Sequence, residues 1–553
     1  MVVRDSFVRS IAGISLLALL MLIAIRTLRA PQCEFGDGRE YVLQTQALVV
    51  DRALAINPSV RATYWNETNP FGVQLDSQRS EPPNEDDEGE KRQFGGKFGS
   101  LYLDTGGAYR YIHSWVYSLF VAPWYAILHE VSSGSREYEA FRLANIAIVF
   151  LPLVLLWRLR PEVSSLVFIL IVLTSPVTPH LQFSHPEIFC LGCILLSFVL
   201  LKSRLRWCAP LFLGAAAAQN IPIVFFFPLH VWFMWRSKRE QVTPKEFIRG
   251  LFAYGAALCM PLGILAYNVH VFGTWNLIAH LGQADVTYLS VRKLMAVFVS
   301  PMIGVAWYLP ASWLAVVIAL GRRLYADTIV TVGSVFLVAA LSSSTANINS
   351  AQLSACRYAV WYLAPLYVLP FVGGAAELRN RSRASKVLEW GGLVVIGVVW
   401  WWLGTYRFLA GDVFQFSALQ RARPEVGTLY RISHLHDDVE PLVENISGAE
   451  IPVAFRFWGV YVWNLGNKES LWVLSQRAMI KAPALQVRTD SDLMGERALE
   501  STFEVKSQGE GLFTLTLRPE ARFERHPFYG GYLILYVPAH IEAIRSAAPT
   551  SLR

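Results

Sequence analysis

Apolar runs about as long as a lipid bilayer is thick recur along the first 408 residues, and they limit the fold more than any other feature. Because backbone polar groups find no water inside a bilayer, such runs are expected to be helices. Several are shorter than a full crossing and would be tilted or re-entrant. Eleven spans are expected, at residues 8–28, 142–157, 163–177, 187–201, 207–219, 221–235, 248–269, 299–320, 326–344, 358–374 and 388–408.

The composition agrees with an α-helical polytopic membrane protein. Only 16% of the 553 residues are charged and 54% are hydrophobic, whereas soluble domains carry roughly 25% charged residues. The net charge of +7 lies mostly in short loops between apolar runs. Membrane topology explains such a surplus, so it does not indicate nucleic-acid binding.

The distribution of basic residues predicts the orientation of these spans. With a cytoplasmic N-terminus, the short inner loops carry sixteen basic residues and the short outer loops three. The inner residues are Arg158, Arg160, Lys202, Arg204, Arg206, Arg236, Lys238, Arg239, Lys245, Arg249, Arg322, Arg323, Arg379, Arg381, Arg383 and Lys386; the outer ones are Arg292, Lys293 and Arg357. Because basic loops stay in the cytoplasm, the C-terminus is expected on the outer side.

The same rule decides how the ambiguous run 115–128 is interpreted. It is apolar enough to cross a membrane, but a crossing here would place every later basic loop outside. We therefore expect an interfacial helix with its tryptophans and tyrosines at headgroup depth. The first span is expected to be retained, because residues 27–30 offer no convincing signal-peptide cleavage site.

Two polar segments remain, and both are expected outside the cytoplasm. Residues 31–114 form a long outer loop within a membrane domain of residues 1–408. Residues 409–553 form a separate small domain, α/β or β-rich. Within it, residues 502–517 alternate around a Gly-containing turn and predict a hairpin, and residues 532–537 predict another strand.

Ionisable residues gather on the outer side of the predicted topology. They are Asp37, Glu40, Arg110, His113, His185, Glu187, Arg292, Lys293, Arg357 and Tyr358. Polar groups near membrane depth are costly and indicate function. Carboxylates together with cations suit a reaction in which a hydroxyl attacks and a phosphate leaves. The carboxylate accepts the proton, and the cations stabilise the charge that develops on the phosphate.

Each of these residues also has a structural interpretation. Asp37 could cap the helix that follows it, and Glu40 could pair with Arg39 at the surface. His185 and Glu187 could cap the fourth span. The basic residues Arg110, His113, Arg292 and Lys293 could be solvated or could anchor the chain to lipid headgroups. The cluster His434, His436, Asp437 and Asp438 does not have a known zinc spacing and is read as a solvated loop.

The pattern resembles the GT-C glycosyltransferases, which use polyprenyl-phosphate-linked sugars outside the cytoplasm and include the bacterial aminoarabinose transferase of lipid A and the protein O-mannosyltransferases. The resemblance covers roughly residues 1–410 and leaves the C-terminal segment unmatched. Three motifs carry it. The first is the acidic Asp37 after the first span, with Tyr41 four positions later and residues 42–50 following. The second is the juxtamembrane segment 111–113, which leads to the Pro-aromatic residues 122–125, and the third is the Arg357–Tyr358 pair followed by Pro365.

The resemblance implies an inverting transferase in a bacterial inner membrane. Asp37 would be the general base, with Glu40 as a second acidic residue. Arg357, Arg110 and His113 would hold the phosphate, and His185, Glu187 and Tyr358 would line the site. The acceptor would be a glycan, a lipid or a protein, bound by the C-terminal domain. No cofactor is required; a divalent metal is compatible with this chemistry, but the sequence offers no ligand set for one.

The sequence departs from the family pattern in two places. The usual acidic pair is Asp37–Gly38 here, and a common Lys appears as His113, which is only partly charged near neutral pH. Gly36 and Gly38 are expected to leave room for a substrate beside the backbone.

Two other function classes stay open. A transporter or flippase of lipid-linked glycans would need polar residues through the mid-membrane or broken helices in paired repeats. A non-enzymatic scaffold with an outer binding domain would leave the cluster of Asp37, His185, Glu187 and Arg357 unexplained. Whether these four side chains meet in one site distinguishes the classes.

Overall fold

The protein was analysed as a computed structural model. It describes residues 2–29, 38–57, 93–94, 101–132, 137–161, 165, 169, 172–173, 177–203, 205–236, 244–280, 284–289, 291–299, 304–345, 356–372, 391, 453–457, 460–463, 484–489, 503–509, 512–517, 535–536 and 541–546. Asp37, residues 58–92 and the His434–Asp438 segment lie outside these ranges.

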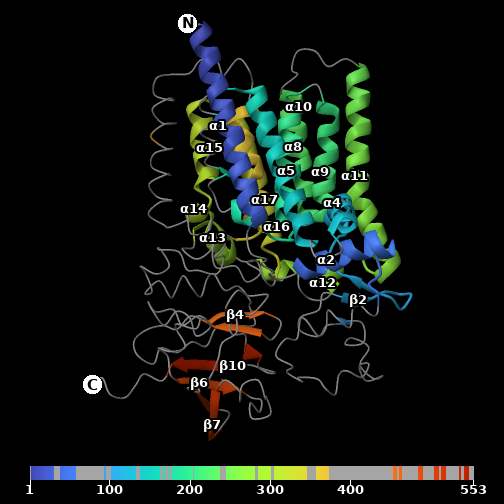
Figure 1. Ribbon diagram of the computed structural model, residues 1–553, viewed down its shortest axis with the longest axis vertical. Coiled ribbons are helices and arrows are strands. Elements are labelled where there is room, and N and C mark those ends of the chain that lie inside the picture. The colour runs from blue at the N-terminus through green and yellow to red at the C-terminus, as the bar shows by residue number, and fades with distance from the viewer. Residues whose placement is uncertain are drawn as a thin grey trace.

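The described part of residues 1–372 is a bundle of helices (Figure 1). Its longer helices are α1 (Val2–Arg29), α4 (Val116–Ser132), α5 (Glu137–Leu159), α8 (Glu187–Leu200), α9 (Ala209–Gln219), α10 (Phe227–Arg236), α11 (Pro244–Phe272), α15 (Pro310–Gly321) and α16 (Tyr325–Ser342). Shorter ones are α2 (Gly38–Gln46), the π-helix η1 (Ala47–Asp51), α7 (Val177–His180), η2 (Arg206–Cys208), η3 (Ile221–Phe226), α12 (Leu277–His280), η4 (Val286–Tyr288), α13 (Val291–Val299), α14 (Val305–Tyr308), α17 (Ala359–Tyr362) and α18 (Ala364–Val372).

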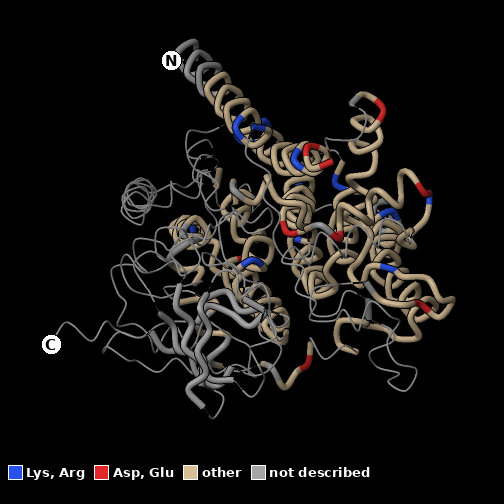
Figure 2. Tube along the Cα trace, turned by 60° about the horizontal axis from the view of Figure 1, so that its bottom comes forward, with Lys and Arg blue, Asp and Glu red and all other residues tan. Residues whose placement is uncertain are grey.

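Three of the described helices are long and apolar enough to cross a membrane. They are Glu137–Leu159, Ile248–Phe272 and Tyr325–Ser342. The remaining apolar helices of the bundle include shorter segments such as Glu187–Leu200 and Ile221–Arg236. Charged residues are sparse along the described helices (Figure 2). The expected helical class agrees with these findings. The count of eleven spans stays a prediction. The expected span 388–408 lies almost wholly outside the described residues.

Small residues let the central helices approach closely. A Cβ atom at Gly192 of α8 would stand 2.6 Å from the carbonyl oxygen of Ile148 on α5. A Cβ atom at Gly214 of α9 would stand 2.5 Å from the carbonyl oxygen of Ala257 on α11. Such contacts are typical of helices that pack in lipid, where small residues bring backbones together. They place α8 inside the bundle, with every residue from Glu187 to Leu200 buried.

A small sheet lies at one end of the bundle, which we call the hairpin end. Strands β1 (Gln93–Phe94), β2 (Leu101–Leu103) and β3 (Tyr109–Tyr111) pair antiparallel in that order, with Tyr102 opposite Arg110. Helix α2 lies at the same end, the lower one in Figure 1. The Asp104–Gly107 turn joins β2 to β3, and Gly107 takes the left-handed φ of +83° that glycine tolerates.

Helix α4 occupies the run expected to be interfacial. It spans Val116–Ser132 and packs against α2 and α5. In Figure 1 it is seen nearly end-on, whereas α11 runs along the bundle. Its place at the membrane boundary stays a prediction.

The described C-terminal residues are strands. β10 (Ile541–Ser546), β6 (Ala484–Thr489), β8 (Leu512–Leu517) and β7 (Phe503–Gly509) form a four-stranded antiparallel sheet in that order. β4 (Val453–Phe457), β5 (Val460–Trp463) and β9 (Leu535–Tyr536) form a second sheet. The β7–β8 pair is the hairpin expected over 502–517, and β9 lies within the strand expected over 532–537. The extent of a C-terminal domain stays a prediction.

Candidate functional site

A buried ion pair joins two helix starts at the hairpin end. Glu187 is the first residue of α8, and Arg357 stands two residues before α17. Arg357 Nε lies 2.8 Å from Glu187 Oε1, and the two side chains are 5% and 2% exposed. Burying two charges is costly and is tolerated only when they are paired with good geometry. The pair therefore fixes the positions of α8 and α17 relative to each other.

His185 extends this pair. Its Nδ1 lies 3.3 Å from Arg357 Nη1. A guanidinium has no acceptor, so the imidazole nitrogen must accept and its proton must reside on Nε2. Nε2 in turn lies 3.6 Å from where a Cβ atom of Gly38 would stand. The imidazole therefore directs its N–H group toward the start of α2.

Gly38 is held closely against this cluster. Ser184 Oγ donates a 2.8 Å hydrogen bond to the carbonyl oxygen of Gly38, and a Cβ atom at Gly38 would stand 2.6 Å from that hydroxyl. Glycine is thus needed here for a close approach between protein segments. The room expected beside Gly38 for a substrate is occupied by Ser184, so that interpretation was wrong. Asp37, the expected base, directly precedes Gly38 in the chain.

Two further residues border Arg357. The guanidinium carbon of Arg357 lies 5.4 Å from the ring centre of Tyr358, in cation–π range. His180, in α7, is buried; burial, and to a lesser degree the charge of Arg357, lowers its pKa to about 3. His180 is therefore neutral near neutral pH, and between these two side chains the positive charge is that of the Arg357 guanidinium.

Glu40 and His113 lie around Tyr41 on α2. Glu40 is 4% exposed and Tyr41 3% exposed. The ring of Tyr41 is stacked on the imidazole of His113, with their ring centres 6.2 Å apart. It meets the ring of Tyr111 edge-on, with ring centres 5.0 Å apart. Its hydroxyl accepts a 3.0 Å hydrogen bond from Gln219 Nε2. Aromatic packing thereby positions His113 against Tyr41, which lies three residues after Gly38 on α2.

Buried polar side chains connect the α2 region to the loop that carries His185. Tyr117 donates from its hydroxyl to Asn145 Oδ1 at 2.8 Å, and Asn145 Nδ2 donates to the carbonyl oxygen of Phe183 at 2.8 Å. The Tyr117 backbone N–H donates to Gln219 Oε1 at 2.8 Å. Burial raises the pKa of Tyr117 well above its usual value, and the nearby charge of Glu187 adds to this. The network holds α4, α5 and α9 around the site.

The sequence analysis missed this supporting network. Asn145 lies within an expected span and Gln219 at the end of another. A polar side chain inside an apolar run is a signal that could have found both, because such groups need partners in a membrane.

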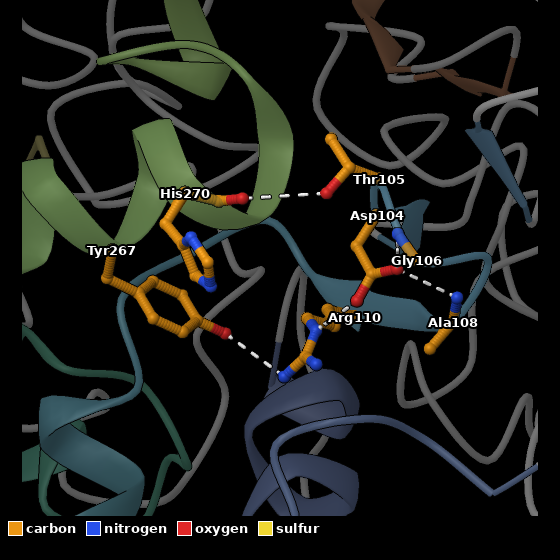
Figure 3. A network of polar contacts seen from close by, with 7 residues as sticks. All are labelled: Asp104, Thr105, Gly106, Ala108, Arg110, Tyr267 and His270. Atoms are coloured by element: carbon orange, nitrogen blue, oxygen red, sulfur yellow. Dashed lines mark hydrogen bonds and ion pairs between the residues drawn. The ribbon is translucent and has the colours of Figure 1, made fainter.

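Arg110 takes part in a different network (Figure 3). Its Nε lies 2.5 Å from Asp104 Oδ2, and its Nη1 lies 3.4 Å from the hydroxyl of Tyr267 on α11. Burial opposes ionisation of Asp104, but Arg110 and the backbone N–H groups of Ala108 and Gly106 outweigh it and lower its pKa. Thr105 N–H also donates to the carbonyl oxygen of Val271 at 2.9 Å.

These contacts attach the β2–β3 turn to the end of α11. Among the described contacts, none joins Arg110 to the Glu187–Arg357 pair. Its expected phosphate-binding role stays a prediction, and the geometry shows it engaged in hairpin docking.

The structure thus brings together His185, Glu187, Arg357 and Tyr358. Glu40 stands two residues after Gly38 on α2, and His113 packs against Tyr41 of the same helix. Of Arg292 and Lys293 the structure describes only the backbone, in α13. Within the described ranges, no group of three or more His, Cys, Asp or Glu side chains could hold a metal ion. The cluster can offer N–H donors to an anion from one fixed guanidinium and one neutral imidazole.

The chain matches no protein-family model, and the comparisons with curated proteins and with solved structures likewise found no match.

Proposed function

We propose that the chain is a GT-C-like glycosyltransferase that transfers a sugar from a polyprenyl phosphate to an acceptor at the outer membrane face. The observation that carries this proposal is the buried Glu187–Arg357–His185 cluster packed against Gly38, next in sequence to Asp37. A permanent cation before a helix start on the expected outer side suits a phosphate-bearing lipid substrate.

The proposal includes a membrane topology. Eleven spans would place the N-terminus in the cytoplasm of a bacterium and the hairpin end, together with residues 409–553, outside. The three described helices of sufficient length support a membrane crossing. The orientation is argued from the basic residues of the expected inner loops.

The proposed reaction is a single inverting displacement. An acceptor hydroxyl or amine attacks the anomeric carbon, a bond from the acceptor atom to that carbon forms, and the bond from carbon to the phosphate oxygen breaks. Asp37 takes the acceptor proton, and polyprenyl phosphate leaves. Covalent geometry keeps the Asp37 Cα atom about 3.8 Å from that of Gly38, so the base would lie within one residue of the cluster.

Arg357 would stabilise the leaving phosphate. A guanidinium carries five N–H donors, so it can hold Glu187 and still bind phosphate oxygens. The ion pair with Glu187 orients the guanidinium before substrate arrives, which lowers the cost of reorganisation in the transition state. His185 would add a neutral donor through Nε2.

The test is an assay of the purified full chain with a panel of polyprenyl-phosphate sugars, measuring released polyprenyl phosphate. We expect Asp37→Asn to fold, to retain donor binding and to lose transfer by a factor on the order of 10² or more, the usual contribution of a positioned base.

Two controls identify the base. If Glu40→Gln or Glu187→Gln abolishes transfer while Asp37→Asn does not, the base is a different carboxylate within the same class of enzyme. If none of the three carboxamide variants changes transfer, the proposal is wrong.

A further inference from the structure

Asn145 places a polar amide inside the apolar helix α5, where its side chain is fully buried. Its Nδ2 donates to two backbone carbonyl oxygens, that of Leu181 at 3.2 Å and that of Phe183 at 2.8 Å. Polar side chains within an apolar membrane helix are costly unless they are paired, and they indicate a function. The partners of this amide show what that function is.

The chemistry of these partners fixes the orientation of the amide. A carbonyl oxygen only accepts, so the amide nitrogen of Asn145 must be the atom that faces the two carbonyls. The amide oxygen then faces the hydroxyl of Tyr117, which donates to it at 2.8 Å. The Tyr117 ring packs against Phe141 and Phe189, with ring centres 5.5 and 5.7 Å away. The amide is therefore held in one arrangement by a side chain of α4.

The two carbonyls belong to the loop 181–186, which joins α7 to α8. Every residue of this loop is buried, so its backbone polar groups need partners within the protein. The next two side chains make contacts in the candidate site. Ser184 Oγ donates to the carbonyl oxygen of Gly38. His185 Nδ1 lies 3.3 Å from Arg357 Nη1. The amide thus holds the backbone directly before both of these residues.

We propose that Asn145 is a positioning residue for His185. By fixing the carbonyl groups of the loop, it keeps the imidazole on Arg357, with the Nε2–H group available to a phosphate. The contribution to transfer rests on the proposed function, whereas the hold of the amide on the loop does not.

The first test is a double-mutant cycle on polyprenyl phosphate release by the full chain. We expect Asn145→Ala to lower kcat by a factor on the order of 10 or more, because small displacements of a group near the reacting atoms are costly. In a His185→Ala background the same change should lower kcat by less than roughly twofold, since no imidazole is left to position. A residue that only stabilises the fold would lower kcat by the same factor in both backgrounds, and that result would overturn the proposal.

Two further variants keep this test valid if Asn145→Ala folds poorly. Tyr117→Phe keeps the ring and removes only the donor to the amide oxygen, so it should lower kcat by a smaller factor, again only while His185 is present. Asn220→Ala is the matched control, because Asn220 Nδ2 donates to Cys190 Sγ of α8 at 3.2 Å and none of its described contacts reaches the loop 181–186. Its kcat should stay within roughly twofold of wild type. An equal loss in Asn145→Ala and Asn220→Ala would contradict a specific positioning role.

A second cycle, on thermal unfolding, does not depend on the reaction. Asn145→Ala and His185→Ala together should lower the Tm by less than the sum of their separate shifts, with a difference of about 1 °C or more, because coupled residues are not additive. Additive shifts would overturn the positioning role even if the wild-type chain releases polyprenyl phosphate. Non-additive shifts in a chain that releases none from any sugar would reject the proposed function and support the hold of Asn145 on the loop.

Discussion

At the scale of single residues, two variants can separate the contribution of the Glu187–Arg357 ion pair to stability from its contribution to donor binding. Arg357→Met alone would leave a buried, unpaired carboxylate and should destabilise the protein by about 3–5 kcal/mol. The double variant Glu187→Leu/Arg357→Met replaces both charges by apolar groups and should recover most of that stability. Thermal unfolding in detergent measures both effects.

The double variant then decides what the pair does. If Arg357 binds the phosphate of the donor, the stable double variant should still lose donor binding and polyprenyl phosphate release. Wild-type release from that variant would show that the pair only holds α8 against α17.

The residues of the pair could be found from the sequence, but their pairing could not. Glu187 and Arg357 each stand beside an apolar run on the expected outer side, which makes them candidates. They are 170 positions apart, and only the packing of α8 against α17 brings them into contact. Arg110 illustrates the converse. Its sequence position suits the cluster, yet it contacts Asp104, six positions earlier, because the tight Asp104–Gly107 turn brings the two together.

At the scale of elements, close packing between α5 and α8 makes Gly192 sensitive to substitution. Gly192→Ala would place a methyl group 2.6 Å from the Ile148 carbonyl oxygen, so the two helices must separate. We expect a loss of about 1–3 kcal/mol, the usual cost of overpacking. Gly263→Ala on α11 is the matched control, because a Cβ atom there meets nothing within 4 Å. Thermal unfolding of both variants checks the prediction, and equal stability would contradict it.

The attachment of the β2–β3 turn to α11 should depend on pH. The pKa of Asp104 is lowered from its ordinary value of 3.8. A carboxyl group of this kind stabilises the fold above that value, and the contribution is lost as pH falls through the lower folded pKa. Hydrogen exchange of residues 101–111, corrected for intrinsic rates, should therefore be constant from pH 8 to about 5 and faster below about 4.

Two variants serve as controls for that pH dependence. Asp104→Asn removes the titrating group, so exchange in the turn should be fast already at neutral pH. Tyr267→Phe removes only the 3.4 Å contact with Arg110 and should have a smaller effect. Protection that persists unchanged in Asp104→Asn would show that the carboxylate does not hold the turn.

Elements were easier to predict from the sequence than their boundaries. Apolar periodicity and length predict helices such as α5, α11 and α16, because a helix satisfies its backbone polar groups within one segment in lipid. The break between η3 and α10 within the expected span 221–235, and the short helices α17 and α18 within 358–374, were not predicted. Prolines and tertiary packing determine where such helices are interrupted, and the hydropathy of the run does not show these positions.

At the scale of the whole molecule, the two ends of the bundle differ in character. The hairpin end holds the buried Glu187–Arg357 pair with aromatic side chains around Tyr41. The opposite end holds the ion pair between Asp327 of α16 and Arg236 of α10. This asymmetry is what the sidedness of basic loops predicts for a membrane protein, and it yields a direct test of orientation.

Two exposed apolar residues offer labelling positions at opposite ends. Val286, before α13, is 79% exposed, and Leu205, before α9, is 62% exposed. In a cysteine-free background, Val286→Cys should react with a membrane-impermeant thiol reagent added to intact cells. Leu205→Cys should react only after the cells are opened, because its loop lies among the basic residues expected in the cytoplasm. Denatured samples of both variants confirm that each thiol can react. Labelling of Leu205→Cys in intact cells would reverse the orientation, and with it the side on which Asp37 could meet a lipid-linked sugar. Labelling of both positions from outside would contradict the odd number of crossings predicted between them, so at least one of the spans 207–219, 221–235 and 248–269 would be wrong.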